Sequence, residues 1–294
     1  MLGYFMRTKV LGNHIPLLAS IKLTYRCNLS CAGCPFHPRA GMPGSHMTKA
    51  AAIESLGVLK RMGCNFIVFE GGEPLLWKDG GFTFRDLANH ARERFLCVGA
   101  TTNGTLPLDA PTDVLWVSVD GLKPAHDALR SDSYNTVMAN IRSSSHPKLM
   151  VHYTLNARNW RDFAATADIL ASLDQVKGIT VQFFYPYEQG EEDLKLSLED
   201  RREAIETVLR LKKLGYPILN SVWSLKAMIR NTWRCHDRLL ANVEPDGGVS
   251  LGCYVKNRGD IKCADCGFTP VAEASGAMDL RIGSLRAGWD IFLS

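Results

Sequence analysis

The chain has 294 residues, of which 46% are hydrophobic and 22% are charged, and its formal net charge is +4. This is the composition of an ordinary globular protein, and so small a charge gives no argument for nucleic-acid binding. No apolar run reaches the roughly 18 residues that a membrane span needs. Residues 1–17 also lack the unbroken apolar stretch and the cleavage site of a secretory signal. We therefore expect a cytoplasmic protein without a membrane span.

Short β-like runs alternate with amphipathic helical segments between residues 19 and 215. The six runs, several of them almost continuously apolar, are Ile21–Thr24, Phe66–Phe69, Cys97–Thr101, Val114–Val119, Met150–Leu155 and Ile179–Tyr185. Helices are expected to begin near Thr48, Thr83, Asn159 and Ser197. Apolar runs of this kind are typical of parallel strands that helices cover. The pattern predicts an α/β protein with a partial (β/α)6 TIM-like barrel, because a full barrel needs eight such units.

The pattern changes after Gly215. Two short β-like runs in residues 243–251 flank the turn Pro245–Gly248, which predicts a β-hairpin. Cysteines surround this hairpin. The segment from residue 216 to residue 294 is short and has few strands, so it buries little hydrophobic core by itself. We therefore expect a barrel domain at residues 1–215 and a small cysteine-rich domain, stapled by metal, at residues 216–294.

Three of the nine cysteines, Cys27, Cys31 and Cys34, share one loop after the first β-like run. Disulfides are rare in the cytosol, so clustered cysteines indicate metal ligation. Three thiolates on one loop can bind three corners of an iron–sulfur cubane and leave the fourth iron open for chemistry. A structural zinc site is the alternative, although such sites commonly use paired C-x-x-C knuckles and close all four positions.

A second cluster of cysteines lies in the C-terminal segment. It supplies four soft metal ligands, Cys235, Cys253, Cys263 and Cys266. If all four bind one cubane, no iron is left open for a substrate, and the cluster would transfer electrons or hold the fold together. A four-cysteine zinc site is again the alternative. The two remaining cysteines, Cys64 and Cys97, begin strand-like segments and are expected to be small buried hydrophobic residues.

The spacing C-x-x-x-C-x-x-C after the first strand resembles the signature of the radical S-adenosylmethionine (SAM) superfamily. Other segments resemble further motifs of that family in the expected order. They contain Gly71, Gly72 and Glu73 after the second strand, Asn103 after the third, and Ser118, Asp120 and Arg130 after the fourth. These segments all follow strand ends, where the loops of barrel enzymes form active sites. The resemblance covers residues 20–185.

This resemblance implies a role for each motif. Gly71–Glu73 would accept hydrogen bonds from the SAM amino group through backbone carbonyls and the Glu73 carboxylate. Asn103 and Ser118 would lie near the ribose or the carboxylate of SAM, and Arg130 would pair with that carboxylate. Asp120 is the candidate catalytic residue, as a polar anchor for substrate, with a turn-capping role as the alternative.

One position departs from the family pattern. Members of the family usually have an aromatic residue just before the third cysteine, where it packs near adenine, and here that position is Gly33. Two aromatic residues are alternatives for this ring, Phe36 on the loop and Tyr185 on the barrel wall. A simple hydrophobic contact under the loop is an equal interpretation for Phe36.

The C-terminal spacing Cys235…Gly248-x4-Cys253 resembles the opening of the accessory domain called SPASM, and four cysteines match its shortened form, twitch. The resemblance implies a radical enzyme, of oxidoreductase, transferase or lyase type, with a SAM-binding [4Fe–4S] cluster and an auxiliary [4Fe–4S] cluster. One electron reduces SAM to methionine and a 5′-deoxyadenosyl radical, which takes a hydrogen atom from a peptide or small-molecule substrate. A flavodoxin or ferredoxin would supply the electron. The alternative is a non-enzymatic zinc-binding protein with two cysteine sites.

Overall fold

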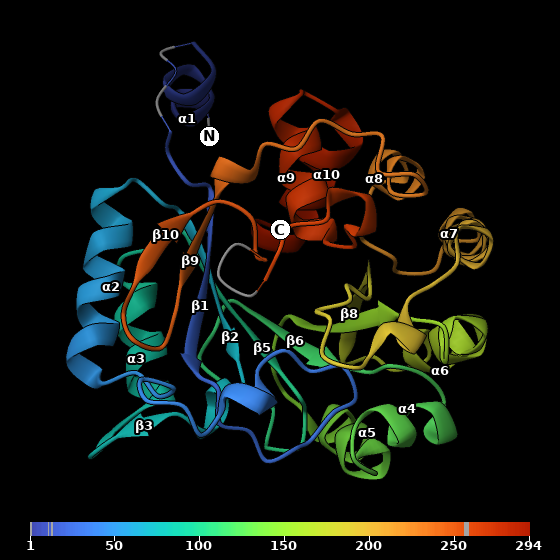
Figure 1. Ribbon diagram of the computed structural model, residues 1–294, viewed down its shortest axis with the longest axis horizontal. Coiled ribbons are helices and arrows are strands. Elements are labelled where there is room, and N and C mark those ends of the chain that lie inside the picture. The colour runs from blue at the N-terminus through green and yellow to red at the C-terminus, as the bar shows by residue number, and fades with distance from the viewer. Residues whose placement is uncertain (1, 11, 13, 256–258) are drawn as a thin grey trace.

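Parallel β-strands form the centre of the computed structural model, which describes residues 2–10, 12, 14–255 and 259–294. Eight strands make one sheet in the order β10-β9-β1-β2-β5-β6-β7-β8, and two short strands, β3 and β4, pair separately. The strands are β1 Leu18–Thr24, β2 Phe66–Gly71, β3 Lys78–Asp79, β4 Phe82–Thr83, β5 Cys97–Thr102, β6 Val114–Ser118, β7 Leu149–Leu155, β8 Val176–Phe183, β9 Leu240–Val243 and β10 Val249–Leu251. Figure 1 shows this sheet curving from β10 to β8.

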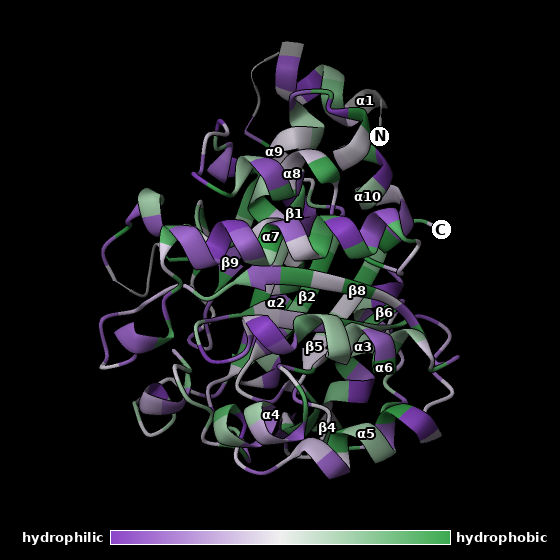
Figure 2. Cartoon of the chain, turned by 90° about the vertical axis from the view of Figure 1, so that its right-hand side faces the viewer, coloured by the Kyte–Doolittle hydropathy of each residue, from purple (hydrophilic) through white to green (hydrophobic). Residues whose placement is uncertain are grey.

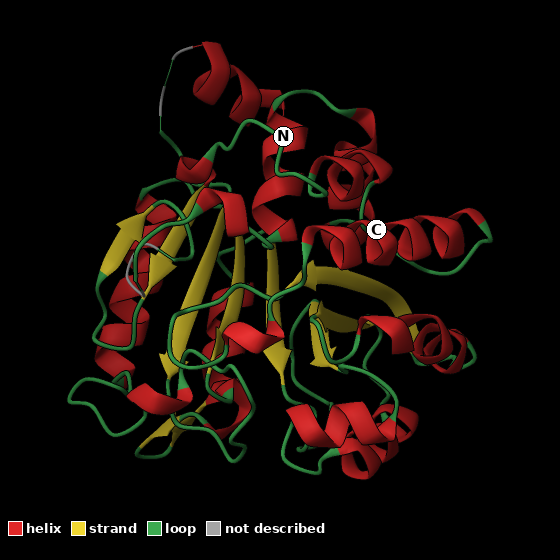
Figure 3. Ribbon diagram, turned by 45° about the vertical axis from the view of Figure 1, so that its right-hand side comes forward, coloured by secondary structure: helices red, strands yellow, loops and turns green. Residues whose placement is uncertain are grey.

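Six neighbouring strands, β1, β2, β5, β6, β7 and β8, pair in parallel in chain order. They coincide with the six runs that the sequence predicts, so the α/β class and the mainly parallel sheet are confirmed. Among the residues that the structure describes, β10 and β8 are the two ends of the sheet. The strands therefore form an open half-barrel, as Figure 3 shows.

Ten α-helices lie within the described parts of the chain. They are α1 Leu2–Phe5, α2 Lys49–Arg61, α3 Phe84–Arg92, α4 Lys123–Leu129, α5 Tyr134–Ser143, α6 Phe163–Ala171, α7 Leu198–Lys213, α8 Val222–Ala227, α9 Thr269–Met278 and α10 Ile282–Phe292. The side chains of Thr48 and Ser197 each accept a backbone hydrogen bond in the first turn of α2 and α7, and Thr83 forms a capping box with Asp86. Asn159 precedes a single 3-10 turn before α6. Side-chain caps of this kind satisfy N–H groups that a helix leaves unpaired. None of the described helices is long and apolar enough to cross a membrane.

Side chains alternate between the two faces of each parallel strand. One face packs into the main core with the outer helices, through residues such as Ile21, Phe69, Val117 and Val151. The opposite face carries polar side chains toward the carboxyl ends of the strands, and these line a cavity: Glu70, Thr101, Ser118, His152, Thr154 and Gln182. Figure 2 shows the hydrophobic strands at the centre and hydrophilic residues on the surrounding helices. The apolar face stabilises the half-barrel, whereas the polar face is available for a ligand.

The segment after residue 215 extends the same sheet. Strand β9 pairs in parallel with β1, and β10 pairs antiparallel with β9, which confirms the predicted hairpin. Helices α9 and α10 lie beside the open side of the half-barrel, and α8 lies next to α7 at its edge (Figure 1). At the end of α10, Phe292 packs against Phe66 and Trp116, with ring centres 5.2 and 5.9 Å apart. The C-terminal helices thus cover one end of the cavity, and the domain boundary after residue 215 stays a prediction.

Candidate functional site

A cavity of about 600 Å³ lies between the polar face of the strands and the C-terminal helices. The sequence predicts a set of site residues in the barrel, and most of them line this cavity. They are Cys27, Cys31, Cys34, Gly71, Gly72, Asn103, Ser118, Asp120 and Arg130. They come from loops that are far apart in the sequence. The structure brings them together because the carboxyl ends of parallel strands meet at one edge.

The glycines that end β2 lie directly against the start of the cysteine loop. The N–H of Gly72 donates to the carbonyl of Thr24 over 2.7 Å, and Gly71 has a φ of +120°. A Cβ atom at Gly72 would stand 2.1 Å from the carbonyl oxygen of Arg26. Only glycine permits so close an approach of two backbones. These two glycines therefore fix the position from which Cys27 enters the cavity.

Replacing Gly72 with alanine should destabilise the site. The added Cβ must push the Arg26 carbonyl away, and overpacking of this kind costs about 1–3 kcal/mol. We expect a lower melting temperature and less bound iron after anaerobic reconstitution. The matched control is Gly81→Ala, because a Cβ at the exposed Gly81 meets no atom within 4 Å. Equal melting temperatures and iron contents for the two variants would contradict this account.

Glu73 supports the neighbouring loop. Its Oε1 accepts hydrogen bonds from the Thr102 hydroxyl (2.8 Å) and the Leu75 N–H (3.0 Å), and its Oε2 accepts one from the Asn103 N–H (2.7 Å). Burial raises the pKa of Glu73 to about 7, while these three donors act in the opposite direction. The side chain is fully buried and its oxygens already bind the protein. Its expected contact with the SAM amino group stays a prediction.

Asn103 joins the third-strand loop to the cysteine loop. Its Nδ2 donates to Asn28 Oδ1 (2.9 Å) and lies 3.5 Å from the sulfur of Cys27. Burial raises the pKa of the Cys27 thiol, and the Asn103 amide partly offsets this effect. An N–H donor directed at sulfur stabilises the thiolate, which is the form that binds iron. Asn103 is therefore placed to orient a ligand of the predicted cluster.

Arg130 provides a positive charge beside the cysteine loop. Its Nε donates to Asp120 Oδ2 over 2.5 Å, and Asp120 Oδ1 accepts a hydrogen bond from the Thr154 N–H over 2.7 Å. Burial raises the pKa of the Cys31 thiol to about 11, and the Arg130 charge opposes that shift. A cation at this position favours a cluster held by thiolates. Both oxygens of Asp120 bind the protein, and its catalytic role stays a prediction.

An aromatic ring does pack against the unusual glycine of the cysteine loop. The ring of Phe184, directly after β8, comes within 2.7 Å of the place where a Cβ at Gly33 would stand. Phe36 stacks on Tyr25, with ring centres 5.6 Å apart, and Tyr185 also lines the cavity. Phe184 could not be predicted from the sequence, because its contact with Gly33 depends on how β8 approaches the loop. Phe184 therefore packs against the position where the family pattern has an aromatic residue.

The thiols of the first cluster suit a cubane. Cys27, Cys31 and Cys34 are all partly exposed and face the cavity. Within the described residues, no three His, Cys, Asp or Glu side chains converge on a single metal ion. A cubane distributes its thiolates over separate irons, so it needs spaced rather than convergent sulfurs. Three thiols on one loop are the number that a cubane with one open iron needs, and this ligand set stays a prediction.

The structure also brings the four C-terminal cysteines together. The Cys235 thiol is close enough to those of Cys253, Cys263 and Cys266 to interact electrostatically with all three. Burial raises the pKa of Cys235 to about 12 and that of Cys266 to about 11. A metal centre would have to replace these thiol protons. Cys64 and Cys97 are each 1% exposed, as the sequence predicts.

A buried arginine supports the C-terminal cysteine cluster. Arg201 donates to the carbonyl of Cys266 over 2.6 Å, and its guanidinium lies 4.6 Å from the centre of the Phe183 ring. Burial lowers the pKa of Arg201 to about 10, so it stays charged at neutral pH. Asn231 donates to the carbonyl of Cys263 over 3.2 Å. The arrangement places one positive charge beside Cys266, one of the four candidate ligands, which is favourable for a bound metal centre.

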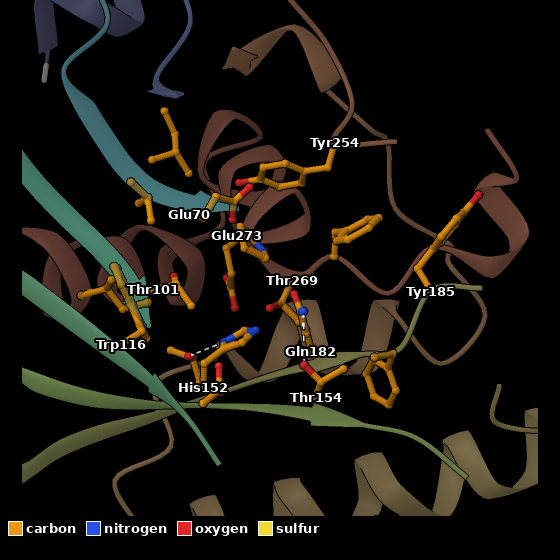
Figure 4. Close-up of a pocket in the computed structure, with 18 of the residues that line it drawn as sticks. Glu70, Thr101, Trp116, His152, Thr154, Gln182, Tyr185, Tyr254, Thr269 and Glu273 are labelled. Carbon is orange, nitrogen blue, oxygen red and sulfur yellow. Dashed lines mark hydrogen bonds between the residues drawn. The ribbon is translucent and has the colours of Figure 1, made fainter. Parts of the chain in front are cut away.

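Four cavity residues were missed by the sequence analysis. Glu70, His152 and Gln182 project from β2, β7 and β8, and Glu273 projects from α9 (Figure 4). The strand residues among them could have been found from polar side chains at alternate positions of an otherwise apolar run. His152, between Val151 and the buried Tyr153, is an example. Such positions point to the inner face of a parallel barrel.

A parallel half-barrel with a cysteine loop and a cavity at the carboxyl ends of its strands has the arrangement of a barrel enzyme. The sequence pattern of the radical SAM superfamily matches residues 21–170, about half of the chain. The chain belongs to the radical SAM superfamily and is an enzyme. Membership implies a [4Fe–4S] cluster and SAM as cofactors.

Two curated relatives come from Methanosarcina barkeri. An Fe-coproporphyrin III synthase is 27% identical over an alignment of 217 positions, which covers 66% of this chain and 52% of the relative. An AdoMet-dependent heme synthase is 26% identical over 300 residues, covering 94% of this chain and 82% of that protein. The chain thus spans about half the length of the first relative and most of the second.

Solved structures share the fold at low sequence identity. The enzyme anSMEcpe with bound AdoMet and the Cp18Cys peptide superimposes with a TM-score of 0.63 and 19% identity. The superposition covers 82% of this chain and 75% of that one. This similarity supports the α/β architecture.

Proposed function

We propose that this enzyme cleaves SAM reductively at a [4Fe–4S] cluster bound by Cys27, Cys31 and Cys34. The observation that carries the proposal is the orientation of this three-cysteine loop toward a cavity of about 600 Å³. When bound, the reduced cluster supplies one electron to SAM, which yields methionine and a 5′-deoxyadenosyl radical that takes a hydrogen atom from substrate. The half-barrel positions the reacting carbon and excludes water from the radical.

The residues around the loop support SAM binding by their placement. Gly71, Gly72 and Ser118 line the cavity close to the strand ends, together with the Arg130 cation. Asn103 orients the Cys27 sulfur. We assign Arg130 to binding the SAM carboxylate, because a guanidinium forms strong charge-assisted hydrogen bonds with carboxylates. Arg130 would keep its ion pair with Asp120 at the same time.

We also propose that residues 216–294 form an auxiliary unit whose four cysteines hold a second [4Fe–4S] cluster. The grouping of the four thiols and the Arg201 charge beside Cys266 support this assignment. Four cysteine ligands leave no iron open, so we assign the cluster to electron transfer. A small electron carrier of the flavodoxin or ferredoxin type would reduce the SAM-binding cluster.

The substrate that we propose is a small molecule or a peptide side chain. Two relatives are named for porphyrin-type products, and a structural neighbour holds a peptide. The cavity volume is within the range of about 300–1,000 Å³ that is usual for small-molecule sites. A substrate group of modest size would therefore fill the space beneath the cysteine loop.

Metal content and SAM cleavage test the proposed function together. Anaerobically reconstituted protein should be brown and contain about eight irons in two cubanes. With dithionite and SAM it should form 5′-deoxyadenosine even without substrate, as measured by liquid chromatography. Protein heated before the assay serves as the control. A colourless protein with stoichiometric zinc and no 5′-deoxyadenosine would contradict the proposal.

A further inference from the structure

Glu273 presents a carboxylate oxygen without a partner to the barrel cavity. Its Oε1 accepts hydrogen bonds from the Ser221 N–H and the Ser224 hydroxyl at the start of α8. Its Oε2 is buried, and no residue of the described chain donates a hydrogen bond to it. Leaving a buried acceptor unpaired costs about 1–3 kcal/mol, and more for a charged group. Figure 4 shows the Glu273 side chain directed into the cavity, which suggests that a ligand satisfies it.

Glu70 adds a second carboxylate to the same cavity. Its Oε1 accepts a hydrogen bond from the Ser20 hydroxyl and lies 3.9 Å from Lys22 Nζ. The fully buried Lys22 also lies 3.4 Å from Glu244 Oε1 and 3.0 Å from Asn242 Oδ1. One lysine is therefore shared between two carboxylates.

On the opposite wall of the cavity, the described side chains of His152, Gln182 and Thr154 contribute no positive charge. Burial lowers the pKa of His152, so its imidazole is neutral at neutral pH. Gln182 and Thr154 are uncharged, and Gln182 Nε2 lies 3.4 Å from the Thr154 hydroxyl. The charge of Arg130 is matched by Asp120 at the cysteine loop.

In the part of the cavity between β2, β7, β8 and α9, Lys212 is close enough to interact electrostatically with Glu273. Its Nζ donates a hydrogen bond to the carbonyl of Ile218, so Glu273 Oε2 keeps its capacity to accept one.

We propose that this part of the cavity binds the substrate through a protonated amine, with Glu273 Oε2 as its main acceptor. Glu70 adds a favourable field from the facing strand. An ammonium group would satisfy the unpaired carboxylate oxygen by a charge-assisted hydrogen bond, whereas a substrate carboxylate would be repelled by the like charge of Glu273. The inference rests on the proposed function, because it names the substrate class of the same cavity. Glu273 is a specificity-determining residue in this account.

Three probes of equal chain length test the proposal. Hexylamine, 1-hexanol and hexanoate are titrated into anaerobic, iron-reconstituted enzyme with SAM at neutral pH, and binding is measured by calorimetry. Hexylamine should bind at least about tenfold more tightly than 1-hexanol, with hexanoate weakest. Glu273→Gln should remove most of this advantage without changing the affinity for 1-hexanol. Glutamine keeps an oxygen for Ser221 and Ser224, so the cap of α8 survives.

The matched control is Glu203→Gln, which makes the same charge change at an exposed position of α7. It should leave hexylamine binding unchanged. Glu70→Gln provides a second variant in the cavity and should weaken hexylamine binding in the same direction. If the melting temperature of Glu273→Gln shows that this variant does not fold, the Glu70→Gln variant tests the proposal in its place.

Three results would overturn the inference. They are equal affinities for the three probes, a preference for hexanoate, and the absence of hexylamine binding up to the millimolar range. A cavity variant that binds hexylamine as tightly as Glu203→Gln would also overturn it. Formation of 5′-deoxyadenosine by the unaltered enzyme is measured on the same preparation. If SAM is cleaved while the probes are not distinguished, only the substrate assignment fails, whereas absence of cleavage would reject the proposed function itself.

Discussion

Replacing Cys27, Cys31 and Cys34 together with alanine should abolish the formation of 5′-deoxyadenosine from SAM. The loop would lose all three thiolates, so no cluster with an open iron could bind SAM. Alanine is preferable to serine because a serine oxygen can itself bind iron. About four of the eight irons expected in the intact enzyme should be lost. Iron analysis and chromatography of the reaction products under dithionite measure both effects.

The control for this variant must remove cysteine without touching either cluster. Cys97→Ala does so, since Cys97 is buried at the start of β5 among apolar side chains. It should keep the full iron content and the rate of SAM cleavage. Circular dichroism of the triple variant should match that of the unaltered protein, because the loop lies at the end of the half-barrel rather than in its core. If the triple variant formed 5′-deoxyadenosine at the normal rate, the SAM-binding cluster would have to lie elsewhere.

Much of the half-barrel could be predicted because its strands are apolar and its helices begin with recognisable caps. The outer face of each strand obeys the simple rule that buried surface is hydrophobic. The pairing of β9 with β1 was not predictable in the same way. That contact joins residues more than 200 positions apart, and nothing in the local pattern of Leu240–Val243 specifies which strand it meets.

In the candidate site, too, local features could be predicted from the sequence and long-range contacts could not. Cysteine spacing and short glycine motifs are local, so the cysteine loop and the loops of Gly71 and Asn103 could be found in the sequence. The remaining contacts depend on tertiary structure. Glu273 reaches the cavity only because α9 lies beside the open side of the half-barrel, and Phe184 meets Gly33 only because β8 ends beside the loop. For Glu73 the motif was visible in the sequence but its contacts were not. Its carboxylate accepts hydrogen bonds from two backbone N–H groups and a threonine hydroxyl.

Replacing Cys263 with alanine should remove the auxiliary cluster while leaving SAM cleavage intact. Cys263 is the suitable first choice because its side chain is exposed, so truncation disturbs little packing. Two of the other proposed ligands, Cys253 and Cys266, pack against the apolar cluster that includes Tyr185 and Phe268. The variant should lose about four irons and one of two paramagnetic signals in the reduced enzyme. Formation of 5′-deoxyadenosine without substrate should continue, because that reaction needs only the cluster on the cysteine loop.

Folding is the main competing explanation, since a small unit held by metal can lose its structure with the metal. Circular dichroism and the melting temperature of Cys263→Ala separate the two effects. A variant that keeps its fold and its SAM cleavage, but loses one cluster, supports separate roles for the two sites. Loss of SAM cleavage from a correctly folded variant would instead mean that the auxiliary cluster supplies the reducing electron.

Ligand binding to the auxiliary cluster decides between electron transfer and substrate binding. The triple variant at Cys27, Cys31 and Cys34 isolates this cluster, so its paramagnetic resonance spectrum can be recorded alone. If Cys235, Cys253, Cys263 and Cys266 occupy all four irons, adding imidazole should leave the spectrum unchanged. A shifted spectrum with new nitrogen hyperfine coupling would reveal an open iron. The role assigned to this cluster would then change from electron transfer to direct binding of substrate, because an iron with a free position acts as a Lewis acid.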